Sequence, residues 1–220
     1  MIGYPTKKRA SIHLEIIEAT NPGYCTFIQY PKIRPISRGC DRLSGSDKKG
    51  KTMNGNSPDA PQLLALDWGT SSLRAFLMRN GQVLETRHSS HGIQHLPTPG
   101  TAGYEQAFAE IAGHWLAHWP DIPVVACGMV GSAQGWKEAP YVRCPADIQK
   151  LADKSVSVPS GLGSNLLIAP GVLFDQPDEL PDVMRGEEIQ IAGALLINPQ
   201  WTERACMLLP GTHSKWALIE

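Results

Sequence analysis

Two short apolar runs and one alternating run open the patterned part of the chain and predict three neighbouring strands. They cover residues 63–66, 73–78 and 83–87. Asn80-Gly81 separates the last two runs, and this pair is the dipeptide most typical of a two-residue β-hairpin turn. We therefore expect residues 62–87 to form a three-stranded antiparallel meander.

The residues that follow alternate between helical and strand patterns. Apolar side chains at helical spacing predict a helix over about 102–118, and Pro120 lies just beyond its end. The continuous apolar run 123–130 is typical of a buried parallel strand. The Gly- and Pro-rich segment 131–165 predicts turns with a short helix near 145–152. The remaining predictions are a strand at 166–169, a helix at 187–196 and a strand at 205–209.

This order of elements predicts an α/β layer fold, because strands come first and helices then alternate with strands. A meander ahead of the first helix disfavours a plain Rossmann order and favours a ribonuclease-H-like arrangement.

Residues 1–60 differ from the rest in charge and pattern. They carry ten Lys and Arg against five acids, whereas residues 61–220 carry ten against sixteen. From 39 to 60 the only large apolar residues are Leu43 and Met53, too few to offset the entropy of ordering. Segments 12–17 and 25–28 could form short elements, but the sequence offers neither a clear partner. We expect a disordered or loosely packed extension.

Composition excludes several classes of protein. The 220 residues are 42% hydrophobic and 19% charged, as in ordinary globular chains, and the net charge of −1 argues against a nucleic-acid partner. No apolar run reaches the 18 or so residues of a membrane span. The five cysteines include no CxxC pair, which argues against a disulfide framework or cysteine zinc site. These features predict a cytoplasmic protein without membrane contact.

Two segments 142 residues apart repeat one pattern, in which an apolar strand leads into Gly-Thr-x-Ser. The first supplies Asp67, Gly69, Thr70, Ser71 and Ser72, and the second supplies Gly211, Thr212, Ser214 and Lys215. Such turns let successive N–H and hydroxyl groups surround anionic oxygens. We interpret the pair as a clamp for a polyphosphate, with Asp67 holding Mg²⁺ through its waters. Tight turns also use Gly and Thr without any ligand, so ordinary turns are the alternative.

The motifs together resemble the 2-dehydro-3-deoxygalactonokinase family, within the superfamily of sugar kinases, Hsp70 and actin. The segments that carry this resemblance are Asp67–Ala75, Gly128–Ser132, Gly135-Trp136, Ala139–Tyr141, Val183–Glu188 and Pro210–Trp216. The resemblance implies transfer of the ATP γ-phosphate to the 6-hydroxyl of 2-dehydro-3-deoxy-D-galactonate, with ATP and Mg²⁺ as cofactors. It implies a first kinase domain at 61–200, with the sugar site and the first phosphate site. Residues 201–220 would begin a truncated second domain. One departure is Ile189, where the family pattern leads us to expect Thr.

The resemblance also points to residues for catalysis and sugar binding. Either Glu187 or Glu188 would be the base, although acids at a helix start also suit the helix dipole. Arg185 would bind the substrate carboxylate, or pair with a neighbouring acid. The sugar contacts would come from Gly128, Met129, Gly131, Ser132, Trp136 and Tyr141, for which plain packing is the alternative.

We therefore predict a sugar-acid kinase that acts on small molecules, of undetermined oligomeric state, and expect this chain alone to be an inactive fragment. Two rival hypotheses stay open at this point. One is a non-catalytic pseudokinase fragment that binds a sugar acid, and the other is a phosphohydrolase on the same fold.

Overall fold

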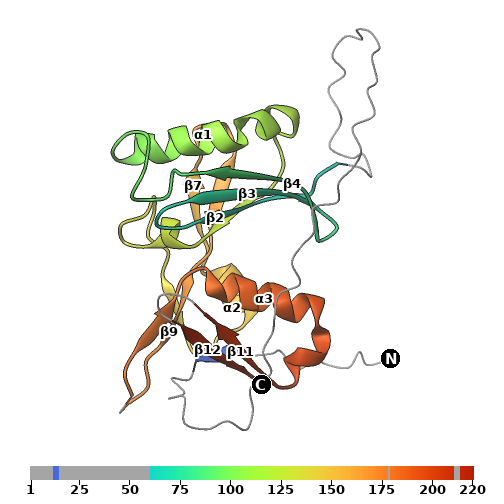
Figure 1. Cartoon of the computed structure of the whole chain (residues 1–220), viewed down its shortest axis with the longest axis vertical. Coiled ribbons are helices and arrows are strands. Elements are labelled where there is room, and N and C mark those ends of the chain that lie inside the picture. Colours follow the sequence, from blue (N-terminus) through green and yellow to red (C-terminus); the bar gives the residue numbers. More distant parts are fainter. Residues whose placement is uncertain (1–11, 15–59, 178, 211–213) are drawn as a thin grey trace.

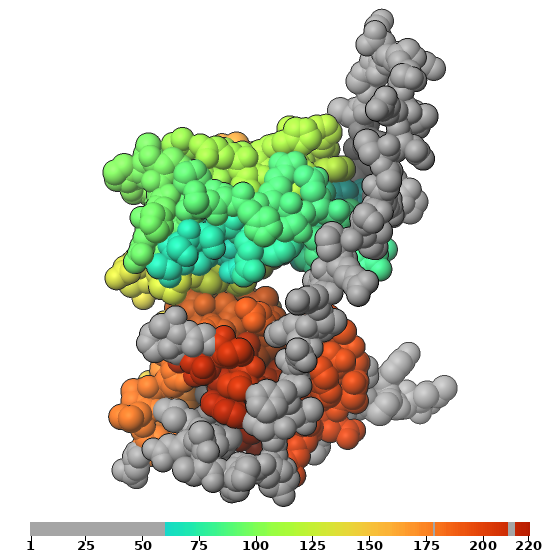
Figure 2. All heavy atoms as spheres, viewed as in Figure 1, coloured from blue at the N-terminus to red at the C-terminus, as the bar shows by residue number. Residues whose placement is uncertain are grey.

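The computed structural model describes residues 12–14, 60–177, 179–210 and 214–220. Two hydrophobic clusters divide these residues into two halves. The upper half consists of a six-stranded sheet covered by α1, and the lower half of two three-stranded sheets with α2 and α3 (Figure 1). In the space-filling view the halves form two blocks that meet at a waist (Figure 2).

The upper half contains the predicted meander and first helix, and both predictions are confirmed. Its elements are β2 (Leu63–Trp68), β3 (Leu73–Arg79), β4 (Gln82–Ser89), α1 (Thr101–His118), β5 (Val124–Cys127), β7 (Val156–Pro159) and β8 (Asn165–Ile168). The strand order is β4-β3-β2-β5-β8-β7. The β2–β5 and β5–β8 pairs are parallel, and the other pairs are antiparallel. Asn80 and Gly81 both have positive φ, as the predicted hairpin turn requires.

Helix α1 covers one face of this sheet with the apolar stripe seen in the sequence. Phe108 and Trp115 are almost fully buried, and Tyr104, Ile111 and Leu116 are at most 5% exposed. The period of 3.6 residues places these side chains on one face, where they pack against the sheet.

The lower half is built from shorter elements. They are β6 (Tyr141–Arg143), α2 (Ile148–Asp153), β9 (Gly171–Phe174), β10 (Asp182–Met184), α3 (Glu187–Ile197), β11 (Ala205–Leu209), β12 (Lys215–Ile219) and β1 (Ile12–Leu14), with a short 3₁₀ turn at Pro199–Thr202. A second 3₁₀ turn, Met129–Gly131, belongs to the upper half, because Val130 lies in the upper cluster. One sheet has the order β10-β9-β6 and the other β1-β12-β11. Helices α2 and α3 and strand β11 confirm the prediction.

Strands β6, β7, β9 and β10 were not predicted. The sequence reading of 131–165 as turns with one helix is wrong for β6 and β7. Each of these four strands has only three or four residues, too few for an alternating pattern to stand out from the surrounding Gly and Pro.

The predicted strand at 123–130 is also too long. Strand β5 ends at Cys127, because Gly128 turns the chain with a φ of 93° into the 3₁₀ turn. A Cβ at Gly128 would lie 2.9 Å from the carbonyl oxygen of Trp68, so only glycine allows the backbones to approach so closely.

The predicted extension at 1–60 lies almost wholly outside the described residues. Only residues 12–14 and 60 of it are described, and β1 pairs antiparallel with β12, although the sequence offered no clear partner for this segment. The lower cluster includes Ile191 and Leu195 together with Met207 and Ala217, on both sides of the domain boundary expected after residue 200. That boundary stays a prediction. Among the described helices, none combines the length and apolar character that crossing a membrane would require.

Candidate active site

The largest gathering of predicted residues surrounds a cavity of about 520 Å³, within the usual size of small-molecule sites. The cavity lies where the carboxyl ends of the parallel strands β2 and β5 meet the start of α3. Its lining residues are Asp67, Gly69, Thr70, Arg74, Gly128, Met129, Arg185, Gly186, Glu187, Gln190, Leu209 and Pro210. The upper half supplies the first six of these and the lower half the rest. We call this cavity the interhalf pocket.

The turn between β2 and β3 forms one wall of the interhalf pocket. The Gly69 N–H donates to the Ser72 carbonyl at 2.9 Å and closes the turn. The N–H groups of Ile93 and Gln94 donate to the carbonyls of Gly69 and Thr70, so the loop after β4 braces the turn from outside. Ser71 and Ser72 are exposed and do not line the pocket.

Asp67 and Arg74 form an ion pair at this wall. They lie opposite each other in the register of β2 and β3, which explains the contact across seven residues of sequence. Arg74 was not among the predicted site residues. The hairpin register was the signal that could have identified it.

Gly128 and Gly186, which both line the pocket, allow the two halves to approach each other closely. Gly186 has a φ of 117°, a conformation that strains any other residue, and it precedes α3. A Cβ at Gly186 would lie 3.4 Å from the Cα of Gly128. The corner after β5 therefore packs directly on the corner before α3, and this contact fixes the acids of α3 relative to β2.

The paired glutamates have different surroundings. Glu187 lines the pocket, and its Oε2 accepts a hydrogen bond from the Arg185 N–H at 3.1 Å. Glu188 is fully buried, and both its carboxylate oxygens accept from the Gly186 N–H at 2.8 and 2.7 Å. Burial raises the pKa of Glu188 from 4.5 to about 7, and the negative charge of Glu187 adds to the rise. Of the two acids, Glu187 lines the interhalf pocket and Glu188 does not.

Arg185 has unused donors beside the pocket. Its Nη2 donates to the Ala139 carbonyl at 2.9 Å, and its guanidinium lies 4.3 Å from the centre of the Tyr141 ring. Its Nε and Nη1 are buried and find no hydrogen-bond acceptor in the part of the chain that the structure describes. A Cβ at Gly131 would come within 3.0 Å of Nη1, so this glycine leaves room for the guanidinium. Buried donors without acceptors are rare, and they mark Arg185 as a group that a ligand oxygen could satisfy.

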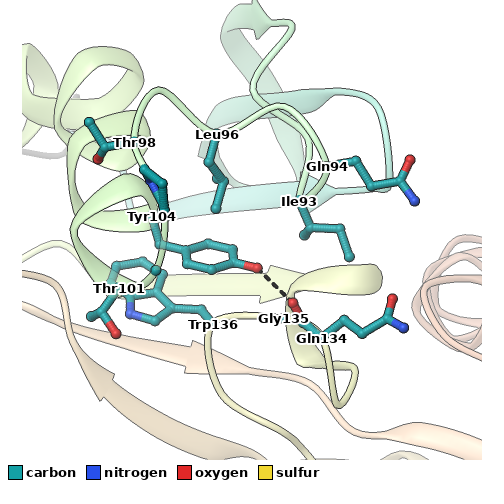
Figure 3. A pocket seen from close by; sticks show the side chains of 11 residues that line it. Ile93, Gln94, Leu96, Thr98, Thr101, Tyr104, Gln134, Gly135 and Trp136 are labelled. Atoms are coloured by element: carbon teal, nitrogen blue, oxygen red, sulfur yellow. Dashed lines mark hydrogen bonds between the residues drawn. The ribbon is translucent and has the colours of Figure 1, made fainter.

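Other predicted sugar contacts lie away from the pocket. Trp136 packs with Trp68 and is stacked on Tyr104, with ring centroids 5.6 Å apart. Figure 3 shows Trp136 and Tyr104 in a second cavity of about 510 Å³, where the Tyr104 hydroxyl donates to the Gln134 carbonyl. Ser132 donates its hydroxyl hydrogen bond to the Met129 carbonyl at 2.8 Å.

The second phosphate hairpin is described only in part. Gly211 and Thr212 fall outside the described residues. Leu209 and Pro210 line the interhalf pocket, so this hairpin starts beside the first one. Ser214 is exposed. The Lys215 ammonium is buried in an ion pair with Asp182, which joins β12 to β10.

The residues around the pocket are compatible with Mg²⁺. The described residues contain no cluster of three or more acids, histidines or cysteines that could enclose a metal ion. Mg²⁺ commonly needs no such cage, because one or two carboxylates, substrate phosphates and waters complete its shell. Asp67 lines the same cavity as the Gly69-Thr70 turn, so it fits a role of this kind.

Comparisons with known proteins give a consistent result. A family model described as 2-keto-3-deoxy-galactonokinase matches residues 67–220. The protein named 2-dehydro-3-deoxygalactonokinase from Escherichia coli (strain K12) is 38% identical over 153 residues, which are 70% of this chain and 48% of that protein. A protein from Rhizobium meliloti (strain 1021), whose name is that of a 2-dehydro-3-deoxygalactonokinase, DgoK1, is 38% identical over 158 residues. These residues are 70% of this chain and 48% of that protein.

A solved structure shows the same likeness in three dimensions. It is a crystal structure assigned as a 2-dehydro-3-deoxygalactonokinase protein from Sinorhizobium meliloti, with a TM-score of 0.58 and 35% identity. The match covers 71% of this chain and 50% of that one. The chain thus spans about half the length of the relatives it matches.

Proposed function

The chain belongs to the 2-keto-3-deoxy-galactonokinase family, and from this premise we propose that it carries the sugar-acid site and the phosphate-binding turns of an ATP-dependent sugar-acid kinase. The reaction transfers the γ-phosphate of ATP to the 6-hydroxyl of 2-dehydro-3-deoxy-D-galactonate. One observation carries the proposal above all others. A single pocket gathers Asp67, the Gly69-Thr70 turn, Arg185 and Glu187 from segments up to 120 residues apart. A cytoplasmic location and small-molecule partners are part of the same proposal.

The strand order supports a ribonuclease-H-like fold for the upper half. The antiparallel meander β4-β3-β2 is followed by α1 and then by β5 and β8, which continue the sheet in parallel. Strand β7 is an antiparallel addition at the far edge. In an open sheet of this kind, ligands bind beyond the carboxyl ends of the central strands, which is where the interhalf pocket lies.

The donor phosphates would bind against the β2–β3 turn. The backbone of Gly69 and Thr70 faces the pocket, and Ser71 and Ser72 would add hydroxyls beside it. Asp67 would hold Mg²⁺, which neutralises charge on the phosphates when it is bound. Gly211, Thr212 and Ser214 would approach from the second hairpin. The buried ion pair with Asp182 favours a structural role for Lys215 over direct phosphate contact.

Glu187 is the proposed base, because it is the member of the pair that lines the pocket. Its carboxylate would accept the proton of the 6-hydroxyl as that oxygen bonds to the γ-phosphorus and ADP leaves. Glu188 would act behind it as a positioning residue, since its carboxylate binds the Gly186 amide that starts α3.

Arg185 would bind the carboxylate of the sugar acid. Its Nε and Nη1 need acceptors, and a carboxylate offers two oxygens with matching geometry. The Tyr141 ring and the Ala139 carbonyl hold the guanidinium in place. Gly128 and Met129 lie on the cavity wall between the two halves and would contact the carbon chain of the sugar acid.

Two measurements test this proposal. Titration calorimetry of the 220-residue chain with 2-dehydro-3-deoxygalactonate should show binding, and galactonate, which lacks the 2-keto group, should bind more weakly. A coupled assay for ADP should show release that depends on the sugar acid in a protein of the relatives' full length. The 220-residue chain alone should release ADP slowly or not at all, since it spans 48% of the length of its relatives.

Variants of the full-length form separate the roles. Glu187→Gln should lower turnover about 10²- to 10⁴-fold with little change in sugar-acid binding. Asp67→Asn should abolish Mg²⁺-dependent turnover without unfolding the protein. ADP release that does not need the sugar acid would instead identify a phosphohydrolase. Sugar-acid binding without any turnover at full length would identify a non-catalytic binder.

A further inference from the structure

The loop that follows β4 binds the β2–β3 turn through its backbone. The Ile93 N–H donates to the Gly69 carbonyl at 3.0 Å, and the Gln94 N–H donates to the Thr70 carbonyl at 3.1 Å. We call residues 91–94 the brace loop. None of the four residues lines the interhalf pocket, so the brace loop lies outside the site described above.

The two hydrogen bonds determine which way the donors of the turn point. In a planar trans peptide the C=O and the N–H point in opposite directions. The carbonyls of Gly69 and Thr70 share their peptide units with the N–H groups of Thr70 and Ser71, so binding the carbonyls directs these N–H groups away from the brace loop. Ile93 and Gln94 line the second cavity (Figure 3), whereas Gly69 and Thr70 line the interhalf pocket. Within the described part of the chain neither N–H group donates a hydrogen bond, so both are available to anionic oxygens.

Gly92 allows the brace loop to approach the turn this closely. It is buried, and a Cβ added to it would lie 2.4 Å from the carbonyl oxygen of Thr70. The same Cβ would lie 2.4 Å from backbone atoms of Ser71 and Ser72. No side chain fits at such distances, so any other residue would push the loop and the turn apart.

The brace loop is itself attached to the core of the upper half. The indole N–H of the fully buried Trp68 donates to the His91 carbonyl at 2.8 Å. The His91 Nδ1–H donates to the His95 carbonyl at 2.9 Å, and the His91 Nε2 lies 3.3 Å from a carboxylate oxygen of Glu110 on α1. The loop therefore fixes the turn relative to both the sheet and α1.

We propose that the brace loop is a positioning element for the donor phosphates, which acts by orienting the N–H groups of Thr70 and Ser71. This inference rests on the phosphate-binding role proposed for the β2–β3 turn. The sugar-acid contacts proposed at Arg185, Gly128 and Met129 come from other segments of the pocket wall. Loss of the brace should therefore impair the use of ATP and leave sugar-acid binding intact.

Two matched pairs of variants of the 220-residue chain test whether the loop holds the turn. Gly92→Ala adds the Cβ that meets the turn, and Gly113→Ala on α1 is its control, because outside its own helix the nearest atom to a Cβ there is 4.0 Å away. Ile93→Pro removes the N–H that binds Gly69, and Ile93→Ala is its control, because it shortens the side chain and keeps the N–H. Proline suits this position, since Ile93 is the second residue of a turn that the His95 N–H closes on the Gly92 carbonyl at 2.9 Å.

Amide exchange followed by NMR gives the first measurement. The Gly69 N–H, which closes the β2–β3 turn on the Ser72 carbonyl, should exchange about tenfold faster in Gly92→Ala and Ile93→Pro than in their controls. Exchange at Gly69 that is equal in each variant and its control would overturn the proposal.

Steady-state kinetics of the same four variants, made in a protein of the relatives' full length, give the second measurement. Gly92→Ala and Ile93→Pro should raise the KM for ATP and lower kcat/KM for ATP about 10- to 100-fold, while the Kd of the sugar acid changes less than about twofold. Partial unfolding alone would lower kcat through the loss of active molecules and would leave the KM for ATP unchanged. The KM for ATP therefore separates positioning from a loss of stability.

Two kinetic outcomes would refute the proposal. One is an unchanged KM for ATP in both Gly92→Ala and Ile93→Pro, and the other is a loss of sugar-acid binding as large as the loss in kcat/KM for ATP. If the unsubstituted full-length enzyme releases no ADP in response to the sugar acid, the proposed function fails. The exchange at Gly69 in the 220-residue chain then still decides whether the brace loop positions the turn.

Discussion

The two halves of the molecule reach their folds by different means. In the described part of the chain the upper cluster has 21 buried residues, four of them aromatic, whereas the lower cluster has 12 with Phe174 as its only aromatic member. The upper half therefore holds most of the buried apolar surface, which is the main source of stability. The lower half depends more on short strands and on single polar contacts, such as the ion pair between Lys215 and Asp182.

The interhalf pocket reflects the same contrast. The upper half supplies backbone and the Asp67–Arg74 pair, placed at the ends of long, regular strands. The lower half supplies Arg185 and Glu187, whose positions depend on one strained glycine and one buried acid. One wall of the pocket thus comes from long, regular strands, whereas the charged groups of the opposite wall are held by a few individual interactions.

Core truncations should have the largest effect and should differ between the halves. Phe108→Ala removes a fully buried ring from the upper cluster and should lower the free energy of unfolding by about 3–5 kcal/mol. Leu195→Ala in the lower cluster should lower it by about 2–3 kcal/mol, because fewer buried neighbours surround it. Urea unfolding followed by circular dichroism measures both. A larger loss for Leu195→Ala would contradict the view that the upper half holds more of the core.

The buried acid of the lower half should make stability depend on pH. The pKa of Glu188 is raised by burial to about 7 in the folded chain, from 4.5, so folding favours its protonated form. Below about pH 4.5 this group has no effect, and stability falls as the pH rises toward 7, by about 3 kcal/mol in total. Glu188→Gln should remove that fall.

Urea unfolding at pH 5 and pH 8 measures this dependence. Glu179→Gln, at an exposed position, is the matched control and should keep the wild-type profile. If Glu188→Gln loses as much stability between the two pH values as the unsubstituted chain does, the buried carboxyl is not the cause.

Removing the arginine of the pocket should have an intermediate effect, on binding. Arg185→Ala removes the donors that we assign to the substrate carboxylate and should weaken sugar-acid binding about 10- to 100-fold, the effect of a charged hydrogen bond. Arg143→Ala removes an exposed arginine that pairs with Asp175 in the same half and should leave binding unchanged. Calorimetry measures both. Equal losses in the two variants would rule out a specific role for Arg185.

A helix cap of the lower half should give the smallest effect. The Asp147 carboxylate accepts the Lys150 N–H at 2.8 Å at the start of α2. Asp147→Ala should lower the free energy of unfolding by about 1 kcal/mol, as expected for an N-cap. Glu179→Ala, outside any helix, should change it by less than about 0.5 kcal/mol. Thermal unfolding of the three proteins would detect the difference, and an unchanged melting temperature in Asp147→Ala would contradict the role of the cap.

The sequence could predict the meander, the first helix and the central strands of the upper half, although not the short strand β7, because their signals are local. The apolar periods of β2, β3 and α1 extend over six or more residues, and the turn at Asn80-Gly81 is a dipeptide signal. The repeated Gly-Thr-x-Ser pattern and the motifs of the family are also readable from neighbouring residues. Strands β6, β9 and β10 have three or four residues each, so only their pairing with distant segments makes them strands.

The identity of the groups at the pocket was decided by tertiary structure. The sequence alone predicts two adjacent acids after Arg185 and Gly186 at a helix start, but both acids have the same local pattern. Which acid lines the pocket is set by how the start of α3 packs on the corner after β5, where Gly186 meets Gly128, and this contact joins residues 58 positions apart. The same holds for β1, whose partner β12 lies some 200 residues away. Local periodicity fixes which elements form, whereas burial and pairing between distant segments fix what each side chain meets, and no local pattern encodes those long-range contacts.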